Sequence, residues 1–515
     1  MRTNRPARFG TAISLLLILA FFAAGCTSPA LATSANPTVP PAFPTQAPAT
    51  DSPAAPTAQE TILPTPTNTA IPQLPLTQYQ LDVQFDYTNH LVSVAEVISI
   101  TNRWQEPLTS LVLDIEANEY PGVFVLDSLA LDDGTLLSQA DFTLADNRME
   151  IPLSTPLMPD SSLTLSLNYR LNLPAIPEAS PYLRPDPFGY SARQTNLVNW
   201  YPYLAAYNPG SGWLMHPVYA FGEHEVYDAA DYSVNLELIN APADLKIAAS
   251  APAEVPADQP DMLHYSLPKA RTFVFSASPI YETATRVVGS TTVTSYTFPW
   301  DASTGEAALD ATARALALYD DLFGPYDRPT LNVVEADFLD GMEYDGLYFL
   351  SNGFYNLYDG TPSGYLTAIA VHETAHQWWY GKVGSDQALE PWLDEAMATY
   401  SEKLYYEHAA PGALDWWQSL RIDYYGPQGM INLPVSEYRY YEPYRNAVYL
   451  NGATFLQGLR DLIGDDAFFG FLKDYATKYA YQRVTTKDFF DTLREHTSAD
   501  LSPLIAQYFD PSLYP

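Results

Sequence analysis

The chain has 515 residues, a formal net charge of −35, 44 prolines and a single cysteine. This length allows two or three domains with sizeable cores. So acidic a chain argues against nucleic acid as a partner, because binding phosphates needs clustered lysines and arginines. One cysteine excludes an internal disulfide and any metal site built from several cysteines.

The first 26 residues have the pattern of a bacterial lipoprotein leader. Three arginines among the first eight residues precede an apolar run at 13–22, which is too short to span a bilayer and indicates a signal peptide over residues 1–25. The leader ends in Ala-Ala-Gly-Cys, which resembles a lipobox and implies acylation of Cys26. Because buried acyl chains hold a protein at a membrane, we expect a lipid anchor at the extracytoplasmic face of the cell envelope. The alternative is an ordinary secretory signal with an incidental cysteine.

Residues 26–76 are rich in proline, alanine, threonine and serine and carry almost no charge. Such a segment cannot bury enough apolar area to offset its ordering entropy, and proline stiffens it toward polyproline II. We interpret it as a tether that holds the folded part away from a membrane or wall. A recognition segment for a proline-binding module is the weaker alternative.

Residues 77–285 contain short runs of alternating apolar and polar residues, such as QLDVQFDYT, SLTLSLNYRLN and YSVNLELIN. Alternation at period two, interrupted by proline, glycine and Asn-Asp clusters, predicts antiparallel strands. Many short strands within about two hundred residues are typical of a β-sandwich-like domain.

From residue 286 to 515 the periodicity becomes helical. Ser303 and Glu306 have the spacing of a capping box and predict the start of an amphipathic helix. A strand, TLNVVEADF, comes next, and helices then dominate, one of them opened by Thr485 and Asp488. The sequence therefore predicts an α+β multidomain fold, in which an antiparallel β-sandwich-like domain precedes an α/β domain that ends in helices.

The apolar helical run YLTAIAVHETAHQWW contains His372, Glu373 and His376. Residues four apart share one face of a helix, so both imidazoles can reach one metal ion. A catalytic zinc site takes three protein ligands, and Glu373 can accept a proton from a water at the open position. The competing interpretation is that both histidines are core residues with satisfied hydrogen bonds and bind no metal.

The third ligand comes after eighteen intervening residues, at Glu395 in PWLDEAMATY. With this spacing the sequence resembles the aminopeptidase N family of gluzincin zinc metallopeptidases, which carries H-E-x-x-H, eighteen residues and then a glutamate. The resemblance implies one zinc ion per chain, held by His372, His376 and Glu395. It also implies that the second domain is thermolysin-like, and it leaves no residues for the large helical C-terminal domain of many members. Seven residues further on, Glu402 lies on the same helical face and matches a family glutamate that orients a ligating histidine.

Two further stretches match the family's substrate-binding and catalytic motifs. The sequence Gly341-Met342-Glu343 resembles part of the family's G-A-M-E-N stretch and implies substrate binding, with Glu343 holding the free α-amine. Tyr344 replaces the family's asparagine, and the acidic or glutamine side chain with which the family completes the amine clamp is not found before NWYPYLAAY. Tyr449 matches the family's catalytic tyrosine, which donates a hydrogen bond to an oxyanion.

The leading hypothesis is a zinc aminopeptidase that acts on peptides. The alternatives are a zinc endopeptidase or oligopeptidase, and a tethered scaffold that keeps the fold without turnover. The remaining histidines have no ligand spacing, and His216 and His224 are expected to be hydrogen-bonded structural residues. The sequence gives no indication of oligomeric state.

Overall fold

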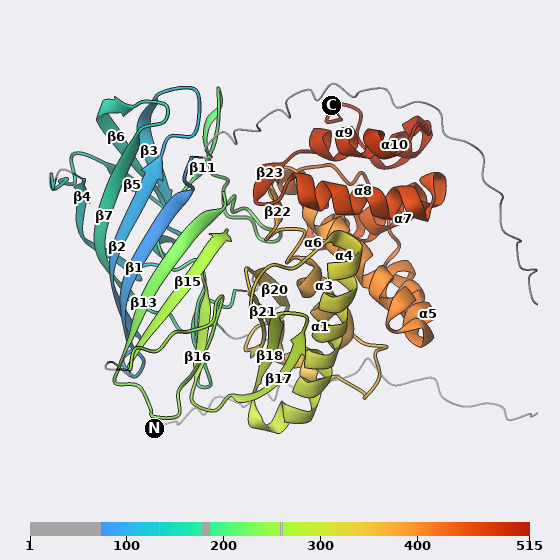
Figure 1. Ribbon diagram of the computed structural model, residues 1–515, viewed down its shortest axis with the longest axis horizontal. Helices are drawn as coiled ribbons and strands as arrows, with labels where there is room; N and C mark the ends of the chain where they lie inside the picture. The colour runs from blue at the N-terminus through green and yellow to red at the C-terminus, as the bar shows by residue number, and fades with distance from the viewer. Residues whose placement is uncertain (1–73, 133, 178–185, 258, 260, 515) are drawn as a thin grey trace, which may run out of the picture. The chain divides into compact units, whose positions relative to one another are not determined.

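The computed structural model describes residues 74–132, 134–177, 186–257, 259 and 261–514 (Figure 1). The expected signal peptide, Cys26 and nearly all of the expected tether lie outside the described residues. Residues 71–515 form a unit separate from residues 1–70, and everything reported below lies within that unit. Among the described residues, no helix combines the length and the hydropathy needed to cross a membrane.

The first part of the unit is built from β-sheets (Figure 1). The largest has six strands in the order β15 (Met262–Ala270), β13 (Ala230–Ile239), β1 (Thr77–Asp86), β2 (Leu91–Thr101), β7 (Ser162–Asn172) and β4 (Phe124–Leu131). A second sheet has the order β10 (Tyr203–Leu204), β3 (Leu108–Asp114), β6 (Arg148–Leu157) and β5 (Thr143–Ala145), and a short helix, η1 (Glu116–Glu119), follows β3. A third sheet has the order β14 (Lys246–Ala249), β16 (Phe275–Ser278), β9 (Thr195–Leu197) and β8 (Gly189–Tyr190), and β11 (Ala206–Asn208) pairs with β12 (Gly212–Leu214).

Most strand pairs in this part are antiparallel, as the alternation predicts. The exception is β1 with β13, which pair in parallel from Thr77 with Ala230 to Asp86 with Ile239. Parallel neighbours need a long connection, and here the described chain between them contributes eleven further strands.

The second part begins with a five-stranded sheet in the order β17 (Glu282–Val288), β18 (Thr291–Thr297), β19 (Thr330–Ala336), β21 (Leu347–Ser351) and β20 (Gly341–Tyr344). The sequence-based division at residues 285 and 286 falls inside β17, which pairs with β18 along its whole length. Strand β20 lies at the edge of this sheet and is antiparallel to β21.

Helices make up most of the remaining chain (Figure 1). They are η2 (Pro299–Asp301), α1 (Ala302–Phe323), α2 (Asn352–Asn356), α3 (Tyr365–Ala375), α4 (Trp392–His408), η3 (Pro411–Ala413), α5 (Leu414–Trp416), η4 (Trp417–Ile422), η5 (Asp423–Tyr425), η6 (Val435–Glu437), α6 (Tyr441–Arg445), η7 (Asn446–Asn451), α7 (Gly452–Ile463), α8 (Asp465–Lys478), α9 (Thr486–His496) and α10 (Ser502–Tyr508). Two short strands, β22 (Val383–Ser385) and β23 (Gln482–Val484), pair between them. The expected α+β fold with a β-rich first part and helices at the end is confirmed.

One of the two expected capping boxes is present. The Thr485 hydroxyl and the Asp488 side chain cap the start of α9 reciprocally. The capping box expected at Ser303 is wrong, because η2 leads directly into α1 and puts Asp301 at the N-cap. Ser303 therefore lies within the first turn of α1.

Strands β19 and β21 of the five-stranded sheet are buried on both faces. Because successive side chains of a strand point to opposite faces, Val333, Tyr348 and Leu350 belong to the core shared with α1, α3 and α4. Their neighbours Val334, Leu347 and Phe349 belong to the core of the first part. The two hydrophobic cores thus meet across β19 and β21.

The β-rich core encloses the carboxyl group of Glu96. Glu96 is at an inward position of β2, is 1% exposed and lies beside the phenol of Tyr169. Burial raises the pKa of Glu96 well above its ordinary value, and the Tyr169 hydroxyl opposes this shift only in part. A group with a raised folded-state pKa stabilises the native state below its unfolded pKa, and this contribution is lost as pH rises toward the folded value.

The parent protein should therefore lose stability between pH 4 and pH 8, and Glu96→Gln should not. We expect the stability of Glu96→Gln relative to the parent to increase as the pH rises from 4 to 8. The expected gain in the free energy of unfolding is about 1–3 kcal/mol, the typical cost of desolvating a buried polar group. Urea denaturation at both pH values measures it. The exposed strand substitution Glu282→Gln is the control and should stay within about 0.5 kcal/mol at both. A constant difference for Glu96→Gln across this range would contradict the argument.

Candidate active site

Helix α3 brings two histidines and a glutamate into the interior. Every residue of α3 after Tyr365 is buried, so the helix has no solvent face. His372 lies in its last turn, and His376 is its C-cap, one turn further on. Their ring centroids are 4.8 Å apart.

Helix α4 contributes a carboxylate between these imidazoles. Glu395 lies in its first turn, with Oε2 3.1 Å from His372 Nε2 and 3.7 Å from His376 Nε2. One ligand-type atom from each of the three residues lies within 4.8 Å of the others, and all three residues are buried. Two imidazole nitrogens and one carboxylate oxygen are the donor set of a catalytic zinc site. The residues therefore fit the metal that the sequence predicts.

The remaining ring nitrogens are held by acids on the same helix α4. Glu402 Oε1 lies 3.0 Å from His372 Nδ1, so the structure brings Glu402 to the position expected for an orienting residue. Asp394 Oδ1 lies 2.7 Å from His376 Nδ1. This second contact was not expected from the sequence. Such partners fix the ring orientation and the tautomer of a ligating histidine.

A buried cation neutralises Glu402. Arg421 donates from Nη2 to Oε1 at 2.8 Å and from Nε to Oε2 at 3.0 Å, and the Trp417 indole donates to Oε2 at 2.8 Å. Although burial opposes ionisation, Arg421 and His372 hold the pKa of Glu402 below its ordinary value. The carboxylate is therefore charged and fixed where it meets His372.

Glu373 lines the same cavity, which has a volume of about 240 Å³. Its side chain lies against Gly341 of the edge strand β20, and a Cβ added to that glycine would collide with Glu373 Oε1. Burial raises the pKa of Glu373 well above its ordinary value. A buried carboxyl group of this kind is poised for proton transfer.

Tyr449 also reaches the cavity, from the π-helical segment η7. Its hydroxyl donates to Glu395 Oε1 at 2.6 Å, and its ring lies parallel to that of His372 at 6.0 Å. The structure thus places the expected catalytic tyrosine beside the expected metal ligands.

Alternation along β20 separates the residues expected to bind substrate. Gly341 and Glu343 line the cavity, and Gln387 donates to Glu343 Oε1 at 3.3 Å. Met342 instead faces the opposite side of the strand and packs against the β-rich core. The side chain of Met342 is therefore outside the cavity wall, and substrate binding by Met342 stays a prediction.

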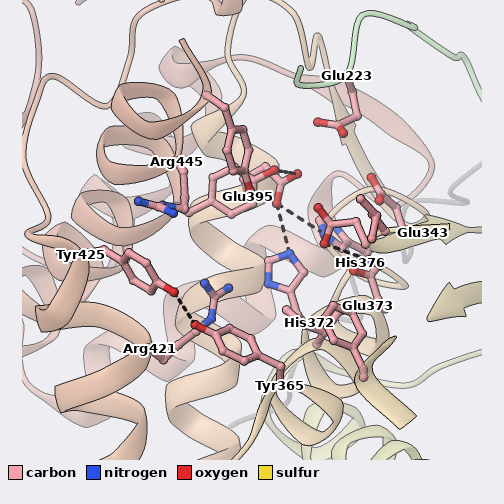
Figure 2. Close-up of a pocket in the computed structure, with 17 residues that line it drawn as sticks. Glu223, Glu343, Tyr365, His372, Glu373, His376, Glu395, Arg421, Tyr425 and Arg445 are labelled. Atoms are coloured by element: carbon pink, nitrogen blue, oxygen red, sulfur yellow. Dashed lines mark hydrogen bonds and ion pairs between the residues drawn. The ribbon is translucent and has the colours of Figure 1, made fainter. Parts of the chain in front are cut away.

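A second acid near Glu343 was missed by the sequence reasoning. Glu223, from the loop between β12 and β13, lines the cavity and lies on the same side as Glu343 (Figure 2). No sequence pattern indicates Glu223, because it belongs to no strand or helix.

His216 and His224, in the loop between β12 and β13, have hydrogen-bonding partners. His216 Nε2 lies 3.0 Å from Asp386, and His224 Nε2 lies 3.2 Å from Glu116. His224 also belongs to a group with Glu116 and Glu225 whose ligand-type atoms lie within 4.8 Å of one another. These residues are more than a hundred positions apart at the extremes, so their sequence spacing gave no sign of the group.

The fold and the site define a two-part α+β protein with the histidine and glutamate set of a gluzincin. Residues 307–508 match the Peptidase family M1 domain, and the resemblance to the aminopeptidase N family is thereby confirmed.

Curated relatives match about two fifths of the chain. Aminopeptidase M1-B of Oryza sativa subsp. japonica is 29% identical over 240 residues, which are 44% of this chain and 27% of the relative. Endoplasmic reticulum aminopeptidase 1 of Mus musculus is 28% identical over 216 residues, 39% of this chain and 23% of the relative. The chain thus spans about a quarter of the length of the curated relatives it matches.

Solved structures resemble the chain over a longer range. The M1 zinc metallopeptidase of Deinococcus radiodurans has a TM-score of 0.59 at 20% identity, over 86% of this chain and 96% of that one. A variant of that enzyme bound to a Tyr-Ser-Ala substrate has a TM-score of 0.60 at 21% identity, over 86% and 95%. At this identity the likeness shows a common fold.

We expect Arg421→Met to destabilise the protein strongly, because it leaves the Glu402 carboxylate buried without its cation. Breaking a buried ion pair in this way typically costs about 3–5 kcal/mol of unfolding free energy. Urea denaturation in the presence of a chelator measures this loss without any contribution from a metal. The matched control is Arg170→Met, whose pair with Asp127 is about half exposed (55% and 42%) and should cost less than about 1 kcal/mol. Equal losses in the two variants would contradict the role of Arg421.

Proposed function

We propose that the protein is a zinc-dependent aminopeptidase that removes N-terminal residues from peptides. The observation that carries this proposal is a single cavity. The three expected zinc ligands line its wall, together with Glu373, Tyr449 and Glu343. Relatives named aminopeptidases and the Tyr-Ser-Ala substrate of the Deinococcus radiodurans neighbour support the assignment.

His372, His376 and Glu395 would hold the zinc ion. When bound, zinc acts as a Lewis acid and lowers the pKa of a coordinated water. Glu373 takes a proton from the attacking water and passes it to the departing amine, which requires a carboxylate inside the cavity. The Tyr449 hydroxyl donates to the oxyanion that develops on the scissile carbonyl.

The acidic side of the cavity would select a free N-terminus. Glu343 is 4% exposed and therefore offers a charge-assisted hydrogen bond to an ammonium group in a largely desolvated place. Glu223 adds a second acid on that side. Strand β20 is an edge strand, so its free backbone groups can pair with the backbone of an extended peptide.

The test compares peptides with free and with acetylated N-termini. We expect the purified, zinc-loaded protein to release single N-terminal residues from free peptides and to spare the acetylated ones, because acetylation removes the charge that Glu343 binds. Removal of zinc with a chelator should abolish the release. Mass spectrometry of the products measures both.

Two other outcomes would replace the proposal. Chelator-sensitive cleavage of the acetylated peptides would identify an endopeptidase or oligopeptidase. Tightly bound zinc with no cleavage of any peptide would identify a scaffold that keeps the fold.

We expect Glu373→Gln to lose turnover by about 10²- to 10⁴-fold, the usual contribution of a general base. Zinc content should be unchanged, because Glu373 is outside the ligand set. Parallel measurement of hydrolysis and of bound zinc tests this. Undiminished turnover would remove Glu373 from the mechanism.

We propose a location as well: the extracytoplasmic face of the cell envelope, with a lipid anchor at Cys26. This proposal rests on the sequence of the leader and of the tether alone. Acylation would add apolar chains that bind bilayers at about 0.8 kcal/mol for each buried CH₂ group.

We expect Cys26→Ser to move the protein from the membrane fraction to the soluble fraction of an expressing bacterium. Mass spectrometry should find acyl chains on the N-terminal peptide of the parent protein and none on the variant. The matched control is Ser28→Ala, which leaves the cysteine in place and should stay in the membrane fraction. A parent protein without acyl chains would overturn the anchor.

A further inference from the structure

The charged side chains of the active-site cavity are divided between two sides. Figure 2 shows Glu223 and Glu343 on one side of the His372 and Glu395 pair, and Arg421 and Arg445 on the other. The arginine side is also aromatic, with Tyr425 and Tyr365 joined by a hydroxyl contact of 2.8 Å. The cavity therefore changes from acidic to basic across the expected zinc ligands.

The two arginines are bound differently. Arg421 is 6% exposed, and its Nε and Nη2 groups donate hydrogen bonds to Glu402. The charge of Arg421 is therefore neutralised within the protein. Arg445, the last residue of α6, donates from Nε and Nη2 only to Asn446 Oδ1, a neutral acceptor, at 3.1 and 2.9 Å. Within the described part of the chain, no carboxylate lies at ion-pair distance from Arg445.

The one further acid of the cavity wall does not neutralise Arg445. Asp340 accepts a hydrogen bond from Gly341 N at 3.0 Å, and the arginine that acts on its charge is Arg421. A cation without a carboxylate partner is notable in a chain with 25 lysines and arginines against 60 aspartates and glutamates.

Aromatic rings fix the position of the Arg445 guanidinium. Its Cζ lies 4.1 Å from the ring centroid of Tyr425 and 5.8 Å from that of Tyr441. Such stacking restrains the guanidinium while leaving its edge free to donate. A planar fork of this kind binds a carboxylate through two parallel hydrogen bonds.

We infer that Arg445 binds the C-terminal carboxylate of a short peptide, so that the preferred substrates are di- and tripeptides with both ends free. This inference rests on the proposed function, because the amine at Glu343 sets the direction of the substrate. A peptide that begins there and passes the zinc ligands reaches the basic side with the residues that follow the scissile bond. Only a short peptide presents its terminal carboxylate at that point.

The test uses tri-alanine and tri-alanine amide, which differ only in the C-terminal charge. We expect kcat/KM to favour the acid by about 10- to 100-fold, as hydrogen bonds to a charged group typically do. Arg445→Met should bring the ratio of acid to amide close to one, and Arg445→Lys should keep part of it. The matched control is Arg439→Met, because Arg439 is exposed, stacks on Tyr440 at 5.2 Å and does not line the cavity. It should keep the parent ratio.

Calorimetric binding to the zinc-loaded Glu373→Gln variant separates this inference from the proposed function. Tighter binding of the acid that disappears in the Glu373→Gln, Arg445→Met double variant supports the carboxylate site even if the parent protein hydrolyses nothing. Equal kcat/KM and equal binding for acid and amide would overturn the site while leaving an aminopeptidase. A preference for Ala-Asp amide over tri-alanine would also overturn it, because Arg445 would then bind an acidic side chain.

Discussion

The mutual neutralisation of buried charges between α3 and α4 is the constraint on which the site depends. All six ionisable residues that these helices contribute to it are at most 4% exposed: His372, Glu373, His376, Asp394, Glu395 and Glu402. Isolated charges in such a place would cost several kcal/mol each. They are tolerated because each imidazole lies between two carboxylates and Arg421 balances Glu402. A divalent cation between the imidazoles and Glu395 would compensate the remaining excess of negative charge.

The five-stranded sheet forms the side of the cavity where we expect substrate to bind. Strand β20 runs at the sheet edge directly beside Glu373, and the missing side chain of Gly341 is what allows that approach. Because alternate residues of a strand face opposite ways, Glu343 points into the cavity while Met342 and Tyr344 pack toward the β-rich core. The same strand thus serves the site and the packing of the first part.

Local spacing predicted the parts of the site that lie within one helix or one motif. The four-residue separation of His372 and His376 and the face shared by Glu395 and Glu402 follow from helical geometry alone. The contacts that were missed join segments separated along the chain: Glu223 comes from a loop of the first part, and Arg445 of α6 stacks on Tyr425 of η5. The parallel pairing of β1 with β13 has the same origin, because alternation shows that a strand forms and not which strand it pairs with.

The covering of β19 and β21 on both faces has a consequence for how the chain can be divided. Val334, Leu347 and Phe349 are fully buried and belong to the core of the first part. A fragment that starts at β17 would expose this apolar face to water and would be prone to aggregate. The expected zinc ligands and reacting groups all lie in the second part. The β-rich part nevertheless covers one face of β19 and β21. Any expression or recombination strategy must therefore keep the two halves in a single polypeptide.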